Sequence, residues 1–255
     1  MPCELELNFF ENFSLQSIDK LGWSVESDNA VWSVGFVPEL GTDNCLTTAI
    51  LPEEYKIDGC IWSPMLDGSD APTVSVTWEQ WFDGVPGAVP GTLSQRVRSS
   101  FFPGEEQTLW LVSLDNLPQQ VPAIWMNQIP HKYSSSGFQL GFCFDIPVGN
   151  QLLVWGIDTV KIGAGSPPRF VEVVEPILIQ PGDVKSRTAT AADPDSNHPL
   201  SFYLQGPNHG HIEELTVDAT STTALLLAHP TEVGHLGNWE YILTASDGFF
   251  TDRLN

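Results

Sequence analysis

Short alternating runs of β-branched and aromatic residues recur along the chain, and they restrict its fold more than any other feature. Clear examples lie at residues 31–37, 74–82, 138–145 and 152–162, and clusters of Gly, Pro, Asp or Ser separate such runs. This alternation is typical of strands with one buried face, whereas amphipathic helices repeat their apolar residues every three to four positions. Because no long segment has the helical period, the sequence predicts an all-β protein built from sandwiches.

A Gly- and Pro-rich segment at residues 163–169, GAGSPPR, interrupts this pattern and predicts a domain boundary. We place the first domain at residues 1–164 and the second at residues 165–255. The second domain contains its own series of short strand-like runs, with the size and rhythm of an immunoglobulin-like sandwich. No exact internal repeat relates the two halves.

The charge balance excludes several classes of partner. The 255 residues include 10 Lys plus Arg against 32 Asp plus Glu, a net charge of −22. Nucleic-acid binding needs a basic surface, so it is excluded, and anionic membranes are disfavoured for the same reason. No apolar stretch of 18 residues is present, which argues against membrane insertion.

The composition resembles that of extracellular or virion β-proteins, and we expect an extracellular, cell-surface or virion location. No secretion signal is visible at the N-terminus, where Met1 leads into an acidic alternating run. We therefore expect either assembly inside a cell, as for a phage structural protein, or a sequence that is part of a longer one.

The four cysteines are Cys3, Cys45, Cys60 and Cys143. None forms a Cys-x-x-Cys pair, so a zinc ribbon or a thioredoxin-like site is not expected. Two disulfides could form in an oxidising compartment, and the preferred pair is Cys45 with Cys60, which brackets a short loop. The alternative is four reduced, partly buried thiols.

Oxygen-bearing side chains alternate at Asp193, Asp195 and Asn197, directly before the strand-like run 200–204. A further carboxylate, Asp247, follows a later strand-like run. Such side chains in irregular turns can converge on one point, and Ca²⁺ takes about six to eight oxygen ligands. The pattern predicts a calcium site, with solvated turn-forming residues as the alternative.

The second half resembles bacterial cadherin-like or immunoglobulin-like tandem domains. The residues that carry the resemblance lie at 192–195, 199–202, 206–210, 229–234 and 245–248. Acidic loops of that family often bind Ca²⁺, so the resemblance implies Asp193, Asp195 and Asp247 as ligands. Glu175 is a further candidate, and Asn197 stands where an acidic residue is common.

The first half resembles concanavalin A-like jelly rolls, especially MAM-type modules. The matching residues are Phe10-Glu11-Asn12-Phe13, Gly22-Trp23 and the closing run at 156–162. The resemblance implies a jelly-roll sandwich whose first and last strands pair. It also implies adhesion, carbohydrate binding or structural assembly, although a fold alone does not decide a function.

Nine tryptophans are available for contact with sugar rings, which stack on aromatic faces. The best candidates are Trp78, Trp81, Trp110 and Trp125. In the run 74–82, strand alternation places Trp78 on the apolar face and Trp81 with Glu79 on the mostly polar face. We therefore expect Trp78 in the core and Trp81 exposed as a contact residue, with core packing as the alternative for most tryptophans.

Motifs for catalysis are missing from the sequence. The Glu-x-Asp-x-x-Glu arrangement of jelly-roll glycosidases, the Gly-x-Ser-x-Gly elbow and the His-Glu-x-x-His motif are all absent. The sequence therefore predicts a non-catalytic structural or adhesive protein of an extracellular, filament or virion assembly, with a calcium-braced connector domain. Its expected partners are other proteins or copies of itself. A carbohydrate-binding module is the alternative, and a polysaccharide hydrolase or lyase is the second alternative.

Overall fold

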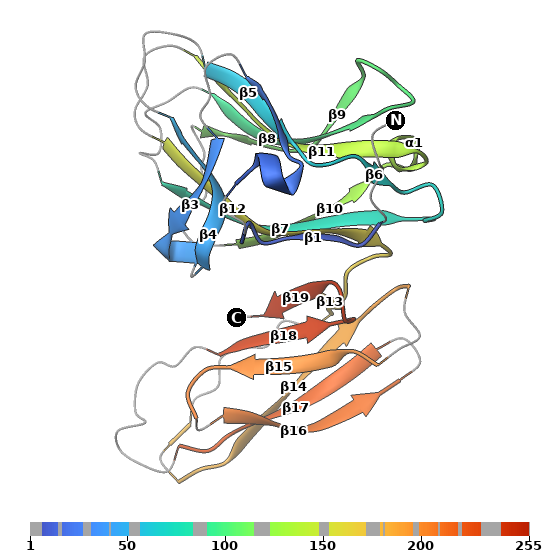
Figure 1. Cartoon of the computed structure of the whole chain (residues 1–255). Helices are drawn as coiled ribbons and strands as arrows, with labels where there is room; N and C mark the ends of the chain where they lie inside the picture. The colour runs from blue at the N-terminus through green and yellow to red at the C-terminus, as the bar shows by residue number, and fades with distance from the viewer. Residues whose placement is uncertain are drawn as a thin grey trace. The chain divides into compact units, whose positions relative to one another are not determined.

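A computed structural model describes most of the chain (Figure 1). The described residues are 7–14, 17–27, 32–40, 42–50, 57–83, 91–114, 123–147, 153–171, 179–180, 182–195, 199–208, 210–218, 221–230 and 241–254. The chain divides into two compact units, Met1–Gly165 (unit 1) and Ser166–Asn255 (unit 2). The division falls in the Gly- and Pro-rich segment that follows Ile162.

Strands make up nearly all of the regular structure in unit 1. They are β1 Phe9–Glu11, β2 Ser24–Ser27, β3 Trp32–Val37, β4 Thr42–Ile50, β5 Ile57–Trp62, β6 Leu66–Asp67, β7 Val74–Asp83, β8 Thr92–Ser99, β9 Glu106–Ser113, β10 Ala123–Ile129, β11 Gly137–Ile146 and β12 Leu153–Ala164. The described residues of the unit also form three single turns of helix, the 3₁₀ turns η1 Asp19–Leu21 and η2 Pro38–Leu40 and the helix α1 His131–Ser134. None of the helices in the described part of the chain is long and apolar enough to cross a membrane.

Two antiparallel sheets form the sandwich of unit 1. Sheet A has the order β2-β5-β11-β8-β9, with β6 paired to β11, and sheet B has the order β10-β7-β12-β4-β3. β1 pairs with β12 in sheet B, so the two ends of the unit lie side by side. Figure 1 shows the two sheets stacked face to face. The all-β sandwich that the alternation predicts is confirmed.

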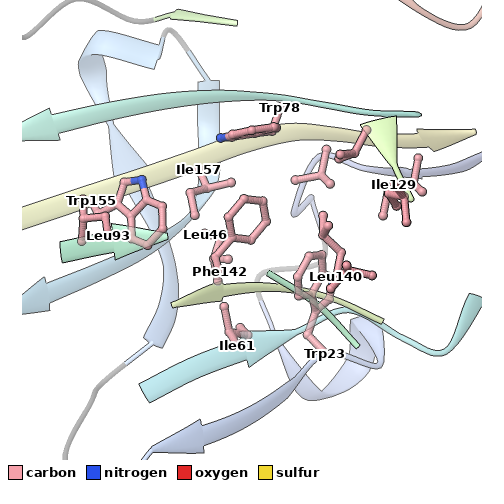
Figure 2. Packing of buried hydrophobic residues seen from close by; sticks show 14 of the residues in the cluster. Trp23, Leu46, Ile61, Trp78, Leu93, Ile129, Leu140, Phe142, Trp155 and Ile157 are labelled. Atoms are coloured by element: carbon pink, nitrogen blue, oxygen red, sulfur yellow. The ribbon is translucent and has the colours of Figure 1, made fainter. Parts of the chain in front are cut away.

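An aromatic layer fills the space between the sheets (Figure 2). Phe142 of sheet A lies against Trp78 and Trp155 of sheet B, with ring centroids 6.0 and 5.9 Å apart. The side-chain oxygen of Gln80 accepts hydrogen bonds from the indole N–H of Trp78, at 3.0 Å, and of Trp155, at 3.2 Å. Buried aromatic rings contribute roughly 1.5–3 kcal/mol each, and the shared acceptor satisfies two buried donors at once. Trp78 is in the core, as its position on the apolar face predicts.

Unit 2 is a smaller sandwich. Its strands are β13 Arg169–Phe170, β14 Lys185–Ala192, β15 Ser201–Gln205, β16 Gly210–Val217, β17 Ser221–Ala228, β18 Ile242–Ser246 and β19 Thr251–Leu254. They form one sheet of order β13-β14-β17-β16 (sheet C) and one of order β15-β18-β19 (sheet D). Small residues such as Ala189, Ala191 and Ala224 meet Phe202 and Leu243 in the core. Among the described residues, this core has fewer large side chains than that of unit 1.

The disulfide joins Cys60 to Cys143, which face each other across β5 and β11 with their Cα atoms 4.1 Å apart. The preference for a Cys45–Cys60 pair is therefore wrong. Cys45 lies on β4 of the other sheet, so proximity along the chain does not bring the two residues together. It is a buried free thiol, and burial raises its pKa to about 12, helped by the nearby charge of Asp158. Cys3 lies outside the described residues.

Loss of this disulfide should destabilise unit 1. The bond closes a loop of sequence separation 83, and in the chain-entropy model such a cross-link lowers the entropy of the unfolded chain. We expect the Cys60→Ser/Cys143→Ser variant to lose about 4 kcal/mol of unfolding free energy, measured by urea titration. A dithiol reductant should lower the stability of the wild type and leave the variant unchanged. Equal stability of the oxidised and reduced wild type would contradict this account.

Candidate functional site

The outer face of sheet A, opposite the core, has small side chains at its centre. On β11, Phe142 points inward, so its neighbours Gly141 and Cys143 lie on the outer face. In register with Cys143 lie Cys60 on β5 and Ser94 on β8, whereas Gly141 is in register with Trp62 and Arg96. Longer charged residues surround this centre. They are Glu26 on β2, Asp58 on β5, Asp145 on β11, Arg96 on β8 and Glu106 on β9. The difference in side-chain length leaves a depression in the middle of the face.

This depression is a pocket of about 520 Å³, which we call the sheet A pocket. Its lining includes Glu26, Asp58, Cys60, Arg96, Glu106 and Asp145. The lining residues come from five neighbouring strands, β2, β5, β11, β8 and β9. Side chains on paired strands are held more rigidly than side chains on loops, so the positions of these groups are well defined.

An array of three side chains, Trp62, Arg98 and Glu26, borders the pocket. The indole of Trp62 is fully buried although it lies on the outer face, because the guanidinium of Arg98 covers it at 4.1 Å from the ring centroid. The indole N–H donates to Glu26 Oε2 at 3.0 Å, and Arg98 donates to the same carboxylate at 2.8 Å. Cation–π contact and charge-assisted hydrogen bonds thus hold Glu26 in one position at the pocket wall.

Gly141 is required beneath this array. A Cβ atom at position 141 would lie 2.5 Å from the ring of Trp62, closer than real Cβ contacts allow. The indole therefore lies flat on the backbone of β11, between Gly141 and the guanidinium of Arg98. The sequence of β11 makes this possible with a glycine among large apolar residues.

The other walls of the pocket carry charge as well. Asp58 and Asp145 face each other in register across β5 and β11. Arg96 donates from Nε to Ser94 Oγ at 3.1 Å and from a terminal nitrogen to Glu106 at 3.3 Å. The lining therefore offers four carboxylates as acceptors and one guanidinium as a donor.

Trp81 is not the exposed contact residue that strand alternation predicts. It does lie on the face opposite Trp78, but its side chain is only 7% exposed. It packs with Val37, Leu40 and Cys45 on the outer face of sheet B, where the turn η2 contacts β7. Strand alternation determines the face of the sheet on which Trp81 lies. Whether that face is exposed depends on the turn η2, which lies about 40 residues away in sequence and packs over it.

The remaining predicted contact residues lie apart from the sheet A pocket. Trp110 and Trp125 contact each other, with ring centroids 5.3 Å apart, and both pack against the core. They belong to β9 and β10, the end strands of the two sheets, and so fill the edge of the sandwich between them. Glu79 is half-buried on β7, in register with Asp158.

Sequence reasoning missed the residues that do line a pocket. A usable signal lies on β8, where Arg96 and Arg98 alternate with Leu93 and Val97 on the opposite face. Two arginines on one strand face stand out in a chain with only 10 Lys and Arg residues. Their acidic partners come from β2 and β9, and only the strand order brings these residues together.

The three described residues of the predicted calcium site accept hydrogen bonds from nearby backbone groups. The Asp195 N–H donates to Asp193 Oδ1 at 3.0 Å, and the Asp195 carboxylate accepts from the Ser166 N–H. Asp247 Oδ1 accepts from two N–H groups of the turn that follows it, both at 2.7 Å. Within the part of the chain that the structure describes, no three acidic, His or Cys side chains are grouped to hold a metal ion. Asn197 and Glu175 lie outside that part, and the calcium site stays a prediction.

Comparisons with solved structures find distant β-sandwich modules. The K1 cleaved adhesin domain of Lys-gingipain from Porphyromonas gingivalis W83 matches with 13% identity and a TM-score of 0.46, over 62% of this chain and 99% of that chain. A carbohydrate-binding module of the β-sandwich superfamily with promiscuous specificity matches with 10% identity and a TM-score of 0.46, over 63% of each chain. A family 28 carbohydrate-binding module specific for non-crystalline cellulose matches with 10% identity and a TM-score of 0.40, over 64% of this chain and 100% of that chain. No protein-family model and no curated protein matches the sequence.

Gly141→Ala tests the packing beneath the Trp62–Arg98–Glu26 array. In an open strand site this change would be neutral or stabilising, because alanine restricts the unfolded chain. Here the clash with Trp62 should instead lower the free energy of unfolding by about 1–3 kcal/mol, measured by urea titration. In a Trp62→Ala background the same change should cost much less. Equal costs in both backgrounds would show that the indole does not occupy this site.

The calcium prediction is tested by chelation. An ion that binds only the native state raises its stability, so a chelator should lower the melting temperature of the full chain by roughly 5 °C. Asp193→Asn should abolish this response, and Asp183→Asn, an exposed carboxylate of the same unit, should preserve it. A melting temperature that does not change when the chelator is added would contradict the prediction that unit 2 binds Ca²⁺.

Proposed function

We propose that the protein is a non-catalytic binding protein in which unit 1 is a carbohydrate-binding module, with the sheet A pocket as its ligand site. The observation that carries this proposal is the combination of donors and acceptors around a floor of small side chains. Sugar hydroxyls both donate and accept hydrogen bonds, and the pocket presents a guanidinium and four carboxylates to meet them.

The size of the pocket supports a small oligosaccharide as its occupant. Ligand sites typically have volumes of about 300–1,000 Å³, and the sheet A pocket has about 520 Å³. Because the lining residues lie on paired strands, and because Arg98 and Trp62 hold Glu26, little side-chain entropy remains to be lost on binding. This preorganisation raises the affinity by lowering the entropy cost of binding, without additional contacts to the ligand.

The pocket favours hydrogen bonding over ring stacking. Phe144 belongs to the lining but is 1% exposed, and Trp62 is covered by Arg98. Among the described lining residues, no aromatic face is therefore open to stack on a sugar ring. We infer recognition through the pattern of hydroxyl groups, which selects for the identity of a sugar more than for its apolar surface.

In this proposal unit 2 is a connector, and binding by unit 1 attaches the protein to a surface outside the cell or on a virion. The resemblance of residues 192–248 to cadherin-like domains supports the connector role, and Ca²⁺ bracing is part of the same proposal. A second candidate function, assembly with a protein partner or with copies of the chain, is favoured by β16. Among the described strands, β16 lies at the end of sheet C, where backbone groups can pair with an added strand, and it carries the exposed side chains of Leu215 and Val217.

The test is glycan binding by the full chain. We expect one or more glycans to bind without release of products, and Arg96→Ala to weaken the binding about tenfold, which is close to 1.4 kcal/mol. The matched control is Arg187→Ala, which removes an exposed arginine from unit 2 and should leave the affinity unchanged. Glycan arrays identify the ligand, calorimetry measures its affinity, and chromatography detects any turnover. Binding that ignores Arg96→Ala, or turnover of the bound glycan, would contradict the proposal.

A further inference from the structure

The turn that joins β8 to β9, residues 100–105, carries the most exposed large apolar side chain of the described residues. This side chain is Phe101, which is 73% exposed. Single exposed apolar residues are common on protein surfaces and need no explanation by themselves. Phe101 differs from them in two respects. The turn fixes its position, and the turn continues two of the strands that line the sheet A pocket.

Hydrogen bonds fix the backbone of the β8–β9 turn. The N–H of Phe101 donates to Ser99 Oγ at 3.1 Å, and the N–H of Phe102 donates to the Ser99 carbonyl at 3.3 Å. Ser100 joins the turn to β11, because its N–H and its hydroxyl both donate to the Gly137 carbonyl, at 2.8 and 2.9 Å. A turn held in this way loses little conformational entropy when a ligand binds to it.

The two adjacent phenylalanines of the turn have different environments. Phe102 is half-buried beside α1, where the ammonium of Lys132 lies 4.5 Å from its ring centroid. Phe101 lies edge-to-face with Phe102, with ring centroids 5.3 Å apart. Phe102 thus anchors the pair, and the ring of Phe101 is left open to solvent. Figure 1 shows the turn beyond sheet A, on the side away from sheet B.

Polar side chains lie between the sheet A pocket and this ring. Arg96 lines the pocket, and Arg98 follows on the same face of β8, where its guanidinium donates to Gln139 Oε1 at 3.0 and 3.1 Å. Between Arg96 and Ser100 the chain advances roughly 13 Å, at about 3.3 Å per residue. A single sugar or a disaccharide held in the pocket therefore ends short of Phe101, whereas a longer oligosaccharide can reach it.

We propose that Phe101 is a second contact site for a glycan, on which one sugar unit stacks while other units of the same glycan occupy the sheet A pocket. The inference rests on the proposed carbohydrate-binding function and names the ligand class, an extended oligosaccharide that spans the pocket and the turn. The apolar face of a sugar ring packs on an aromatic ring. Among the described lining residues of the pocket no aromatic face is open, so Phe101 supplies a kind of contact that the pocket lacks.

A lipid surface and a partner protein fit this turn less well. Aromatic residues that insert into a membrane surface are accompanied by basic residues that attract anionic lipids. Here Lys132 is already paired with Glu105, and a second carboxylate, Glu106, follows at once. A stable protein interface buries about 800 Å² on each partner, which is far more than the ring of Phe101 offers. The nearby pocket therefore favours a glycan as the occupant.

The experiment compares the dimer and the hexamer of one backbone, for β-1,4-linked oligomers of glucose, xylose, mannose and N-acetylglucosamine. Calorimetry on the full chain should show that the hexamer of a recognised backbone binds more tightly than its dimer. Phe101→Ala should weaken hexamer binding about fivefold and leave dimer binding unchanged, because one stacking contact is lost. Phe101→Trp should keep the hexamer affinity. Arg96→Ala should weaken the binding of both oligomers, because both occupy the pocket.

The matched control is Phe36→Ala, which removes an exposed phenylalanine from sheet B of the same unit and should leave both affinities unchanged. Because Phe101 is exposed, Phe101→Ala should melt at the wild-type temperature. If the hexamer binds no more tightly than the dimer, or if Phe101→Ala leaves the hexamer affinity unchanged, the inference is overturned and the carbohydrate-binding function stands. Equal weakening of both oligomers by Phe101→Ala would overturn it too, since the residue would then act on the pocket itself.

Two further outcomes are separate from these. Self-association of the wild type that Phe101→Ala abolishes, measured by analytical ultracentrifugation, would assign the ring to an interface between copies of the chain and overturn the inference. If none of the dimers and hexamers binds, the proposed function fails and the inference fails with it.

Discussion

The packing of aromatic side chains between two sheets is the interaction on which the structure of unit 1 depends. Phe142 meets Trp78 and Trp155, and Gln80 satisfies both indole N–H groups in the same layer. Once these residues point inward, strand geometry places their neighbours on the outside. The residues that point into the core therefore also determine which residues lie on the outer surface, because successive side chains of a strand point to opposite faces.

The sheet A pocket follows from this constraint and from side-chain size. Around it, charged residues pair with one another, as Arg98 and Glu26 do in the Trp62–Arg98–Glu26 array. At its centre, the lining includes Gly59 and the disulfide-bonded Cys60, whose side chains are short. The pocket is thus a property of one rigid face, and the chemistry that it offers is polar and negatively charged.

The sequence predicted those features that depend on single strands. The all-β class and the buried position of Trp78 follow from alternation within short runs. The partners of Cys60 and Asp58 could not be predicted, because they depend on register between β5 and β11, which are about 80 residues apart in sequence. The prediction that Trp81 is exposed is wrong for a similar reason, because residues of the distant turn η2 pack against its side chain. Pairing information between strands, rather than better propensities, is what the sequence reading lacked.

The position of the disulfide has a mechanical consequence. It joins two strands of one sheet and closes a covalent loop over 83 positions, which includes most of sheet A. When tension is applied through the ends of unit 1, this loop cannot be pulled straight even after the sheets have come apart. About 280 Å of chain is thereby withheld from extension. If unit 1 binds a surface under load, the disulfide would keep β5 and β11, two of the strands that line the sheet A pocket, joined while other strands separate.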